Sequence, residues 1–389
     1  MTDLEANPTA GDDSVRPRWH LDLHPDVRLH PHPQAKRGLG SGFLHPTHAV
    51  LALSGHPAAA ADEKPDGNEK PKRELEWTSR DHRKHRHLVE DPRTGRTRPA
   101  HQDAKKASQG VLGRIGNMRR VEYWNVSWWV AVLFTLGSIV WVVNGFYAFL
   151  PYLLPARFSV DANMEGTGWT AWLGATIFEF GALAGLWEAW NRGDVADFGW
   201  NVGRLARVHR ESESESPNST PNLKTEASPQ KPKHEWIWFS TSGKYFHELG
   251  FLAAFVQYWA ATIFWISGFT AIPTIQNAIS SNQGLLDGVF WTPQVIGGTG
   301  FIIASALMML ETQKRWYLPA PASLGWHVGF WNLVGGVGFM LCGAFGYALE
   351  ESTGIAYQSS CSTFWGGWAF LIGSCIQWYE CVNPVKPSV

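Results

Sequence analysis

Six stretches of the chain are almost entirely apolar, with few or no charged residues inside them. Each has about the length needed to cross a bilayer core of ~30 Å. Trp residues cluster at their ends, as is typical of membrane interfaces. The pattern predicts six transmembrane helices, near residues 126–150, 169–190, 249–272, 289–311, 326–349 and 363–382.

Two short patterns recur three times in these segments. The odd-numbered segments carry (Gly or Ala)-x3-(Trp or Phe)-x3-Gly, in the copies Gly137, Trp141, Gly145; Ala260, Phe264, Gly268; and Gly335, Phe339, Gly343. The even-numbered segments carry Gly-x3-Phe-x2-(Gly or Ala)-x6-Glu, in the copies Gly174, Phe178, Gly181, Glu188; Gly297, Phe301, Ala304, Glu311; and Gly366, Phe370, Gly373, Glu380. The recurrence predicts an all-α, six-helix transmembrane bundle built from three tandem two-helix repeats with pseudo-threefold character.

The repeated glycines are expected to be packing positions. Helix association in lipid depends on close van der Waals contact, and small residues allow it. We therefore expect contacts inside each hairpin at Gly137, Gly145, Gly174, Gly181, Gly268, Gly297, Gly335, Gly343, Gly366 and Gly373.

Composition divides the chain into two different polymers. Residues 1–120 are rich in Pro, His and charged residues and hold few aromatics, whereas most Trp and Phe follow residue 123. The first part has too little apolar surface to offset chain entropy, which predicts disorder. The predicted organisation is a disordered cytosolic tail at 1–120, helical hairpins at 121–191, 245–315 and 324–383, and a cytosolic linker at 192–244 with a low-complexity charged part at 211–233.

Lys and Arg predict the orientation. They gather before the first segment and in the links after the second and fourth segments, whereas Arg157 is the one basic residue of the other loops. Both termini are therefore expected in the cytosol. Residues 1–14 are acidic and have no apolar core, so the first helix must act as the targeting signal, into an endomembrane or the plasma membrane.

The three repeated glutamates should lie at the cytosolic ends of their helices, where the helix dipole disfavours an anion. The favoured explanation is local, because Arg192 follows Glu188 and Arg315 follows Glu311 at i, i+4 spacing. Glu380 has no such neighbour. If the hairpins surround an axis, the carboxylates instead form a ring that attracts cations.

Glu179 is predicted near mid-membrane, about 13 Å deeper than Glu188 at 1.5 Å per residue. The other repeats have Ile302 and Leu371 at this position. An intramembrane carboxylate is a candidate functional site, although a neutral carboxyl that only stabilises helix contacts is an equal alternative. Its possible partners are polar residues of other helices: Asn144, Gln257, Thr262, Gln294, His327, Asn332 and Gln377.

No other residues point to a specific chemistry. Cys342 and Cys361 both fall toward the outer side, where a disulfide is an open alternative. The segment Asp81-His82-Arg83-Lys84-His85-Arg86-His87 is more cationic than a metal site tolerates and is better suited to anionic lipid headgroups. We expect no metal, cofactor or nucleic acid, and no short enzyme motif is present.

Several runs resemble a family of fungal integral membrane proteins without an assigned activity. They are residues 174–179, 247–251, 291–298, 310–321 and 364–374, and the resemblance covers about 120–383. The last hairpin is also weakly similar to YrhK-type two-helix domains of bacteria. Neither resemblance implies catalytic residues.

Three functions are compatible with this pattern. The first is a transporter or channel for a small solute or ion, since parallel repeats about an axis are a transporter-like plan. The second is a structural, sensory or scaffold protein that uses its tail to bind a cytosolic protein. The third is a membrane enzyme acting on a lipid or terpenoid. A polar cavity around Glu179 would favour the first or third, and a packed helix contact the second.

Overall fold

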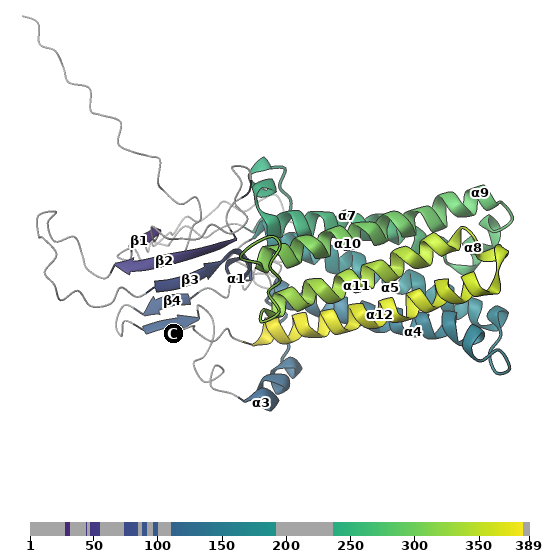
Figure 1. Ribbon diagram of the computed structural model, residues 1–389, viewed down its shortest axis with the longest axis horizontal. Helices are drawn as coiled ribbons and strands as arrows, with labels where there is room; N and C mark the ends of the chain where they lie inside the picture. Colours follow the sequence, from purple (N-terminus) through teal and green to yellow (C-terminus); the bar gives the residue numbers. More distant parts are fainter. Residues whose placement is uncertain are drawn as a thin grey trace, which may run out of the picture.

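Six long helices dominate the computed structural model, which describes residues 28–31, 44, 47–54, 74–84, 88–91, 96–99, 110–191 and 236–383. They run side by side along the long axis of the molecule (Figure 1). Their bounds are α4 (Val126–Leu153), α5 (Val160–Trp190), α7 (Leu249–Thr270), α10 (Thr292–Thr312), α11 (Leu324–Gly346) and α12 (Thr353–Val382).

The six helices form a closed ring. Each packs against the next one in the chain, and α12 packs against α4. Short connections turn the chain at one end, through α8 (Pro273–Ile279), α9 (Gln283–Leu286), η5 (Asp287–Trp291) and η6 (Leu349–Glu351). The opposite end holds α3 (Val111–Gly116), η2 (Asn117–Arg119) and η4 (Gly243–His247).

The apolar segments of the sequence coincide with these helices, but two helices begin earlier than expected. Helix α5 begins at Val160 instead of 169, and α12 at Thr353 instead of 363. The extra turns are too polar to register as an apolar run. In α12 the Ser352 hydroxyl accepts a hydrogen bond from the Gly354 amide at 3.1 Å and caps the helix.

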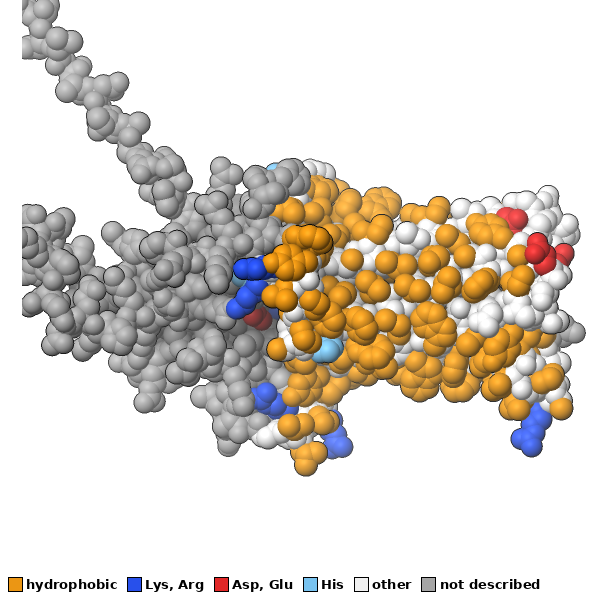
Figure 2. All heavy atoms as spheres, in the orientation of Figure 1, with side chains coloured by type: hydrophobic (Ala, Val, Ile, Leu, Met, Phe, Trp, Pro, Cys, Tyr) orange, Lys and Arg blue, Asp and Glu red, His pale blue; other side chains and the backbone are white. Residues whose placement is uncertain are grey.

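Four helical segments are long and apolar enough to cross a membrane. They are Val126–Leu153, Leu249–Thr270, Gln283–Thr312 and Leu324–Gly346. Figure 2 shows hydrophobic side chains over the visible face of the bundle, with charged side chains near its two ends. This distribution is that of a membrane protein, because a lipid-exposed charge is costly.

Two stacked layers of three aromatic rings, here called the aromatic core, fill the centre of the ring. One layer is Trp141, Phe264 and Phe339, and the other is Phe178, Phe301 and Phe370. Centroid distances are 4.7, 5.3 and 5.6 Å in the first layer. They are 5.4, 5.8 and 6.4 Å in the second. Each helix thus contributes one buried ring to the axis.

Glycines of the repeated patterns make room for these rings inside each hairpin. A Cβ atom at Gly137 would lie 2.5 Å from the Phe178 ring, and one at Gly335 would lie 2.5 Å from the Phe370 ring. Equivalent atoms on the partner helices, at Gly174, Gly297 and Gly366, would meet Trp141, Phe264 and Phe339. Gly181 and Gly373 lie against α4 and α11, within the same hairpins.

The expectation that all these glycines pack inside one hairpin is wrong for Gly145, Gly268 and Gly343. Their added Cβ atoms would meet Phe364 of α12, Ala175 of α5 and Val295 of α10, which belong to the neighbouring hairpin. Residues eight apart are rotated by about 80° around a helix with 3.6 residues per turn. The two ends of the first pattern therefore face different neighbours, and these glycines close the ring.

Replacing Gly268 with alanine is expected to destabilise the bundle by about 1–3 kcal/mol, the usual cost of overpacking. The new Cβ would lie 2.5 Å from that of Ala175 and 3.2 Å from the Ala171 carbonyl oxygen, so α5 and α7 must separate. Gly185→Ala is the control, because nothing lies within 4 Å of its added Cβ. Unfolding in mixed micelles should show a loss at Gly268 alone, and equal losses at both sites would contradict close α5–α7 packing.

The prediction of a disordered tail at 1–120 is wrong for the parts that the structure describes. Strands β1 (Arg28–Pro31), β2 (His48–Ser54) and β3 (Glu74–Thr78) form an antiparallel sheet in that order. A hairpin of β4 (Leu88–Asp91) and β5 (Arg96–Pro99) follows, so the chain is not purely helical. The short helix α1 (Ser79–Arg83) lies between them against the end of the bundle (Figure 1).

The charged linker at 211–233 lies outside the described residues.

Candidate functional site

The three repeated glutamates meet at one end of the helix ring, and we call them the carboxylate triad. Glu188, Glu311 and Glu380 come from the last turns of α5, α10 and α12. Their exposed fractions are 1%, 1% and 4%. Three buried carboxylates at one end of a ring need cationic partners, because an isolated buried charge is very costly.

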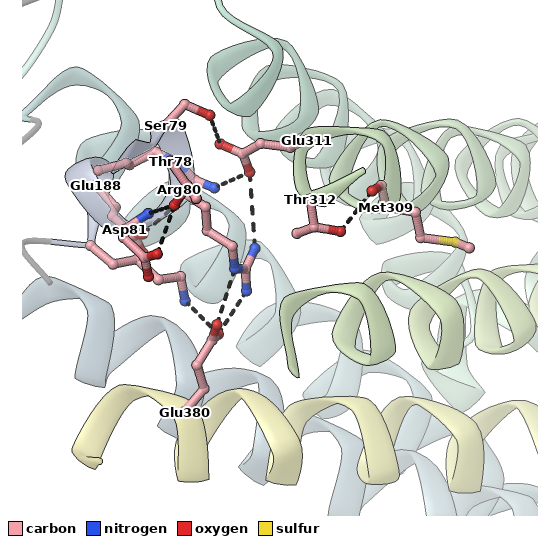
Figure 3. Close-up of polar contacts among 11 residues, drawn as sticks. Thr78, Ser79, Arg80, Asp81, Glu188, Met309, Glu311, Thr312 and Glu380 are labelled. Atoms are coloured by element: carbon pink, nitrogen blue, oxygen red, sulfur yellow. Dashed lines mark hydrogen bonds and ion pairs between the residues drawn. The ribbon is translucent and has the colours of Figure 1, made fainter. Parts of the chain in front are cut away.

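Helix α1 and the residue that follows it supply those cations. Arg80, Arg83 and Lys84 are 6%, 9% and 5% exposed, so they are buried with the triad. Their i, i+3 and i+4 spacing places them on one helix face. Figure 3 shows the side chains of Glu311 and Glu380 directed toward this helix.

Arg83 connects two members of the triad. Its Nη2 atom donates to Glu311 Oε2 at 2.6 Å, and its Nη1 atom donates to Glu188 Oε1 at 3.4 Å. The Ser79 hydroxyl donates to the other oxygen of Glu311 at 3.2 Å. Both oxygens of Glu311 are therefore bonded to α1.

Arg80 binds the third carboxylate with two parallel hydrogen bonds. Its Nε atom donates to Glu380 Oε1 at 3.1 Å and its Nη2 atom to Glu380 Oε2 at 2.7 Å. Such bidentate pairing is among the strongest hydrogen-bonded ion pairs in proteins. Lys84 Nζ lies 3.4 Å from the same Oε2 atom, and Arg80 Nη1 lies 3.9 Å from Glu311 Oε2.

Among the residues that the structure describes, three cations face the three carboxylates of this site. Burial by itself lowers the pKa of Arg80, but Glu380, followed by Glu311 and Glu188, outweighs burial, and the pKa is raised. Arg80 is therefore always charged. A buried ion-pair cluster adds little net stability compared with apolar packing, yet it is intolerant of losing one partner. The site thus selects a specific docked position for α1.

Local contacts fix the conformation of α1. Thr78 precedes the helix, and its hydroxyl accepts a hydrogen bond from the Asp81 amide at 3.1 Å and donates to Asp81 Oδ2 at 2.7 Å. The Ser79 amide donates to the Thr47 carbonyl oxygen at 2.9 Å. The N-terminal cap and this strand-side contact hold the basic face toward the triad.

Two glycines at the start of bundle helices make room for α1, and the sequence analysis missed them. A Cβ at Gly250 of α7 would meet Glu311 and would lie 2.8 Å from Arg83 Nε. One at Gly325 of α11 would meet the side chain of Arg80. Each lies 18 residues before the last glycine of the repeated pattern in its helix, Gly268 or Gly343, and that repeated offset is the signal that could have revealed them.

A small cavity of about 40 Å³ lies on the inner side of the docked α1. Residues from all six helices of the ring line it, and its polar lining includes Gln257, Asn332 and Gln377. That volume accommodates a few waters, since one water needs about 10–15 Å³ by this measure. Gln257 Oε1 is buried there without a protein hydrogen-bond partner, which suits a water site.

Glu179 lies away from this cavity, at the contact between α5 and α7. Its Oε1 atom accepts a hydrogen bond from the Thr262 hydroxyl at 2.9 Å, and its Oε2 atom is buried without a partner. The neighbouring Trp265 indole donates to Thr176 at 3.0 Å across the same two helices. Glu179 therefore belongs to a packed helix contact.

The other residues considered as partners of Glu179 lie elsewhere. The Asn144 amide donates to the Thr167 carbonyl oxygen at 2.7 Å within its own hairpin. The His327 ring lies 2.8 Å from the Pro321 carbonyl oxygen, and Asn332 and Gln377 line the cavity. Thr262 is thus the candidate that the structure brings to Glu179.

The predicted local partner of Glu311 is wrong. Arg315 donates to the Tyr317 hydroxyl at 2.7 Å at an exposed position, whereas Glu311 binds α1. Arg192, the proposed partner of Glu188, lies outside the described residues. The chain turns at Gln313, the residue after α10, so Arg315 is not on the same helix face as Glu311.

Cys342 and Cys361 are free thiols, so the possible disulfide between them is absent. Cys342 Sγ instead lies 3.4 Å from the Ser359 hydroxyl. Within the described ranges, no group of three or more His, Cys, Asp or Glu side chains is placed to hold a metal ion.

No family model, curated protein or solved structure matches the chain.

Proposed function

We propose that all six long helices cross the membrane as three tandem hairpins with both termini in the cytosol. Helices α5 and α12 are more polar than the other four but complete the same closed ring. A ring in which two members lie outside the bilayer would expose apolar faces of the others to water. The basic residues before α4 and after α5 and α10 favour the carboxylate end as the cytosolic end.

Equivalent contacts support the tandem repeat. Each hairpin contributes two rings of the aromatic core, one carboxylate and one ring-closing glycine, at matching positions. A triplicated unit accounts for three such sets without further assumptions. Membership of the family of fungal membrane proteins that the chain resembles is likewise a proposal.

The proposed function is that of a structural or sensory membrane protein whose bundle is a receptor for its own N-terminal segment. The observation that carries it is the burial of Arg80, Arg83 and Lys84 against the carboxylate triad. Docking determines whether strands β1–β5 are held at the membrane or are free to bind a cytosolic protein. The packed environment of Glu179 also favours this function over transport or lipid chemistry.

The second candidate is a cation channel or small-solute transporter closed by α1. The small axial cavity and the acidic triad favour it, because carboxylate rings attract cations in pores. The aromatic core would then be a second closure deeper in the membrane.

Flux through liposomes separates the two functions. The native chain and the triple variant Arg80→Gln, Arg83→Gln, Lys84→Gln are reconstituted and tested with K⁺, Na⁺, Cl⁻ and small organic solutes. We expect no flux in either, because the aromatic core stays closed when α1 leaves. Cation flux in the triple variant alone would overturn the receptor function and establish a plugged channel.

A further inference from the structure

We propose that Ser79 is a regulatory phosphorylation site whose phosphate keeps α1 out of the carboxylate triad. This inference rests on the proposed receptor function and assigns its control to one hydroxyl group. Ser79 is half-buried, and its hydroxyl donates to Glu311 Oε1 at 3.2 Å. It is therefore the one hydroxyl of α1 that directly contacts the triad.

The charge balance makes the site sensitive to a phosphate. Among the described residues, the three cations of the docked state already pair with the three carboxylates, so another anion must compete for them. A phosphoserine adds about −1.5 to −2 charge at pH 7, because its second proton is mostly lost at that pH. At the position of Ser79 Oγ it would place that charge about one hydrogen-bond length from the buried carboxylate of Glu311.

The phosphate would also take a cation from the triad. Arg83 follows Ser79 by four residues, which places both on one helix face. Arginine binds phosphate with paired hydrogen bonds, as it binds carboxylate. Arg83 paired in this way leaves Glu188 without its ion pair to α1 and leaves Glu311 with Arg80 at 3.9 Å.

The reaction takes place on the undocked state. A protein kinase transfers the γ-phosphoryl group of ATP to Ser79 Oγ, ADP leaves, and the hydroxyl proton passes to the base of the kinase. Docking protects the hydroxyl, and phosphorylation prevents redocking. The modification thus shifts an existing equilibrium between docked and free α1.

Hydrogen exchange on the full chain tests the inference. The chain is produced with phosphoserine incorporated at position 79 and placed in nanodiscs of zwitterionic lipid. The amides of Ser79, Asp81 and Lys84 are bonded within the N-terminal segment itself, so their exchange reports how often this segment opens, which docking on the triad suppresses. We expect exchange to rise about tenfold or more, a change of about 1.4 kcal/mol. Exchange of these amides should approach the rate seen in the double variant Arg80→Gln, Arg83→Gln.

Two controls separate charge from structure. Ser79→Ala removes the hydrogen bond alone and should exchange nearly like the native chain. Phosphoserine at Ser242, an exposed residue at the same end of the bundle, adds the same charge and should leave α1 protected. Native protection in the phosphoserine-79 chain, with exchange raised in the arginine variant, would overturn the Ser79 inference. Unchanged exchange in the arginine variant would instead refute docking and the receptor function.

Discussion

Replacing Phe178 with alanine is expected to destabilise the folded bundle by about 3 kcal/mol, the lower end of the range for buried aromatics. Phe178 is 1% exposed and contacts rings from α4, α10 and α12. Its removal leaves a cavity on the axis that no neighbour fills. The lower end applies because the unfolded helices remain in lipid, so lost packing rather than transfer to water sets the cost.

Phe180→Ala is the matched control, on the same helix two residues away. Phe180 is 57% exposed and faces outward, so its truncation should change stability by less than about 0.5 kcal/mol. Unfolding in mixed micelles of mild and denaturing detergent measures both. Equal losses, or a larger loss for Phe180, would show that the aromatic core does not hold the ring together.

Replacing Arg83 with glutamine is expected to undock α1. The change leaves Glu188 and Glu311 buried without their main cation, and breaking a buried ion pair costs about 3–5 kcal/mol. That cost corresponds to roughly a hundredfold or larger shift away from docking. Trypsin cleavage after Lys84, followed by mass spectrometry, measures it, because Lys84 is 5% exposed when α1 is docked.

Arg315→Gln is the control for this change, since Arg315 is the partner that helical spacing assigns to Glu311. It is exposed and contacts Tyr317, so cleavage after Lys84 should stay at the native level. Adding Glu311→Gln to Arg83→Gln removes one unpaired charge and should restore part of the protection. Equal exposure of Lys84 in both arginine variants would mean that the triad is held by local pairs and not by α1.

The buried cluster explains why such a costly arrangement can serve a switch. Apolar contacts would hold α1 more firmly, but they would not respond to a single added charge. In the described part of the chain each cation of the cluster already pairs with a carboxylate, so an added phosphate must compete for one of them. The same ion pairs therefore hold α1 on the triad and make its docking sensitive to a phosphate.

Glu179 shows where sequence reasoning stops. Its place in an apolar segment predicts a costly intramembrane carboxyl, whereas its partner depends on which helix lies beside α5. The ring places α7 there, so Thr262 at 2.9 Å is the partner among seven polar candidates. A carboxyl that looks functional from its position is thus part of a helix contact.

The sequence by itself determined the apolar segments and the repeated Gly, aromatic and Glu positions. These are local properties, because segment length and helical periodicity depend only on residues that are close together in the sequence. Only the tertiary structure decided that six rings meet on one axis, that Gly145, Gly268 and Gly343 face the neighbouring hairpin, and that α1 occupies the triad. Arg83 and Glu188 are 105 residues apart, and Arg80 and Glu380 are 300 apart. No local pattern encodes a contact over that separation, because it forms only when the closed ring brings three helix ends together.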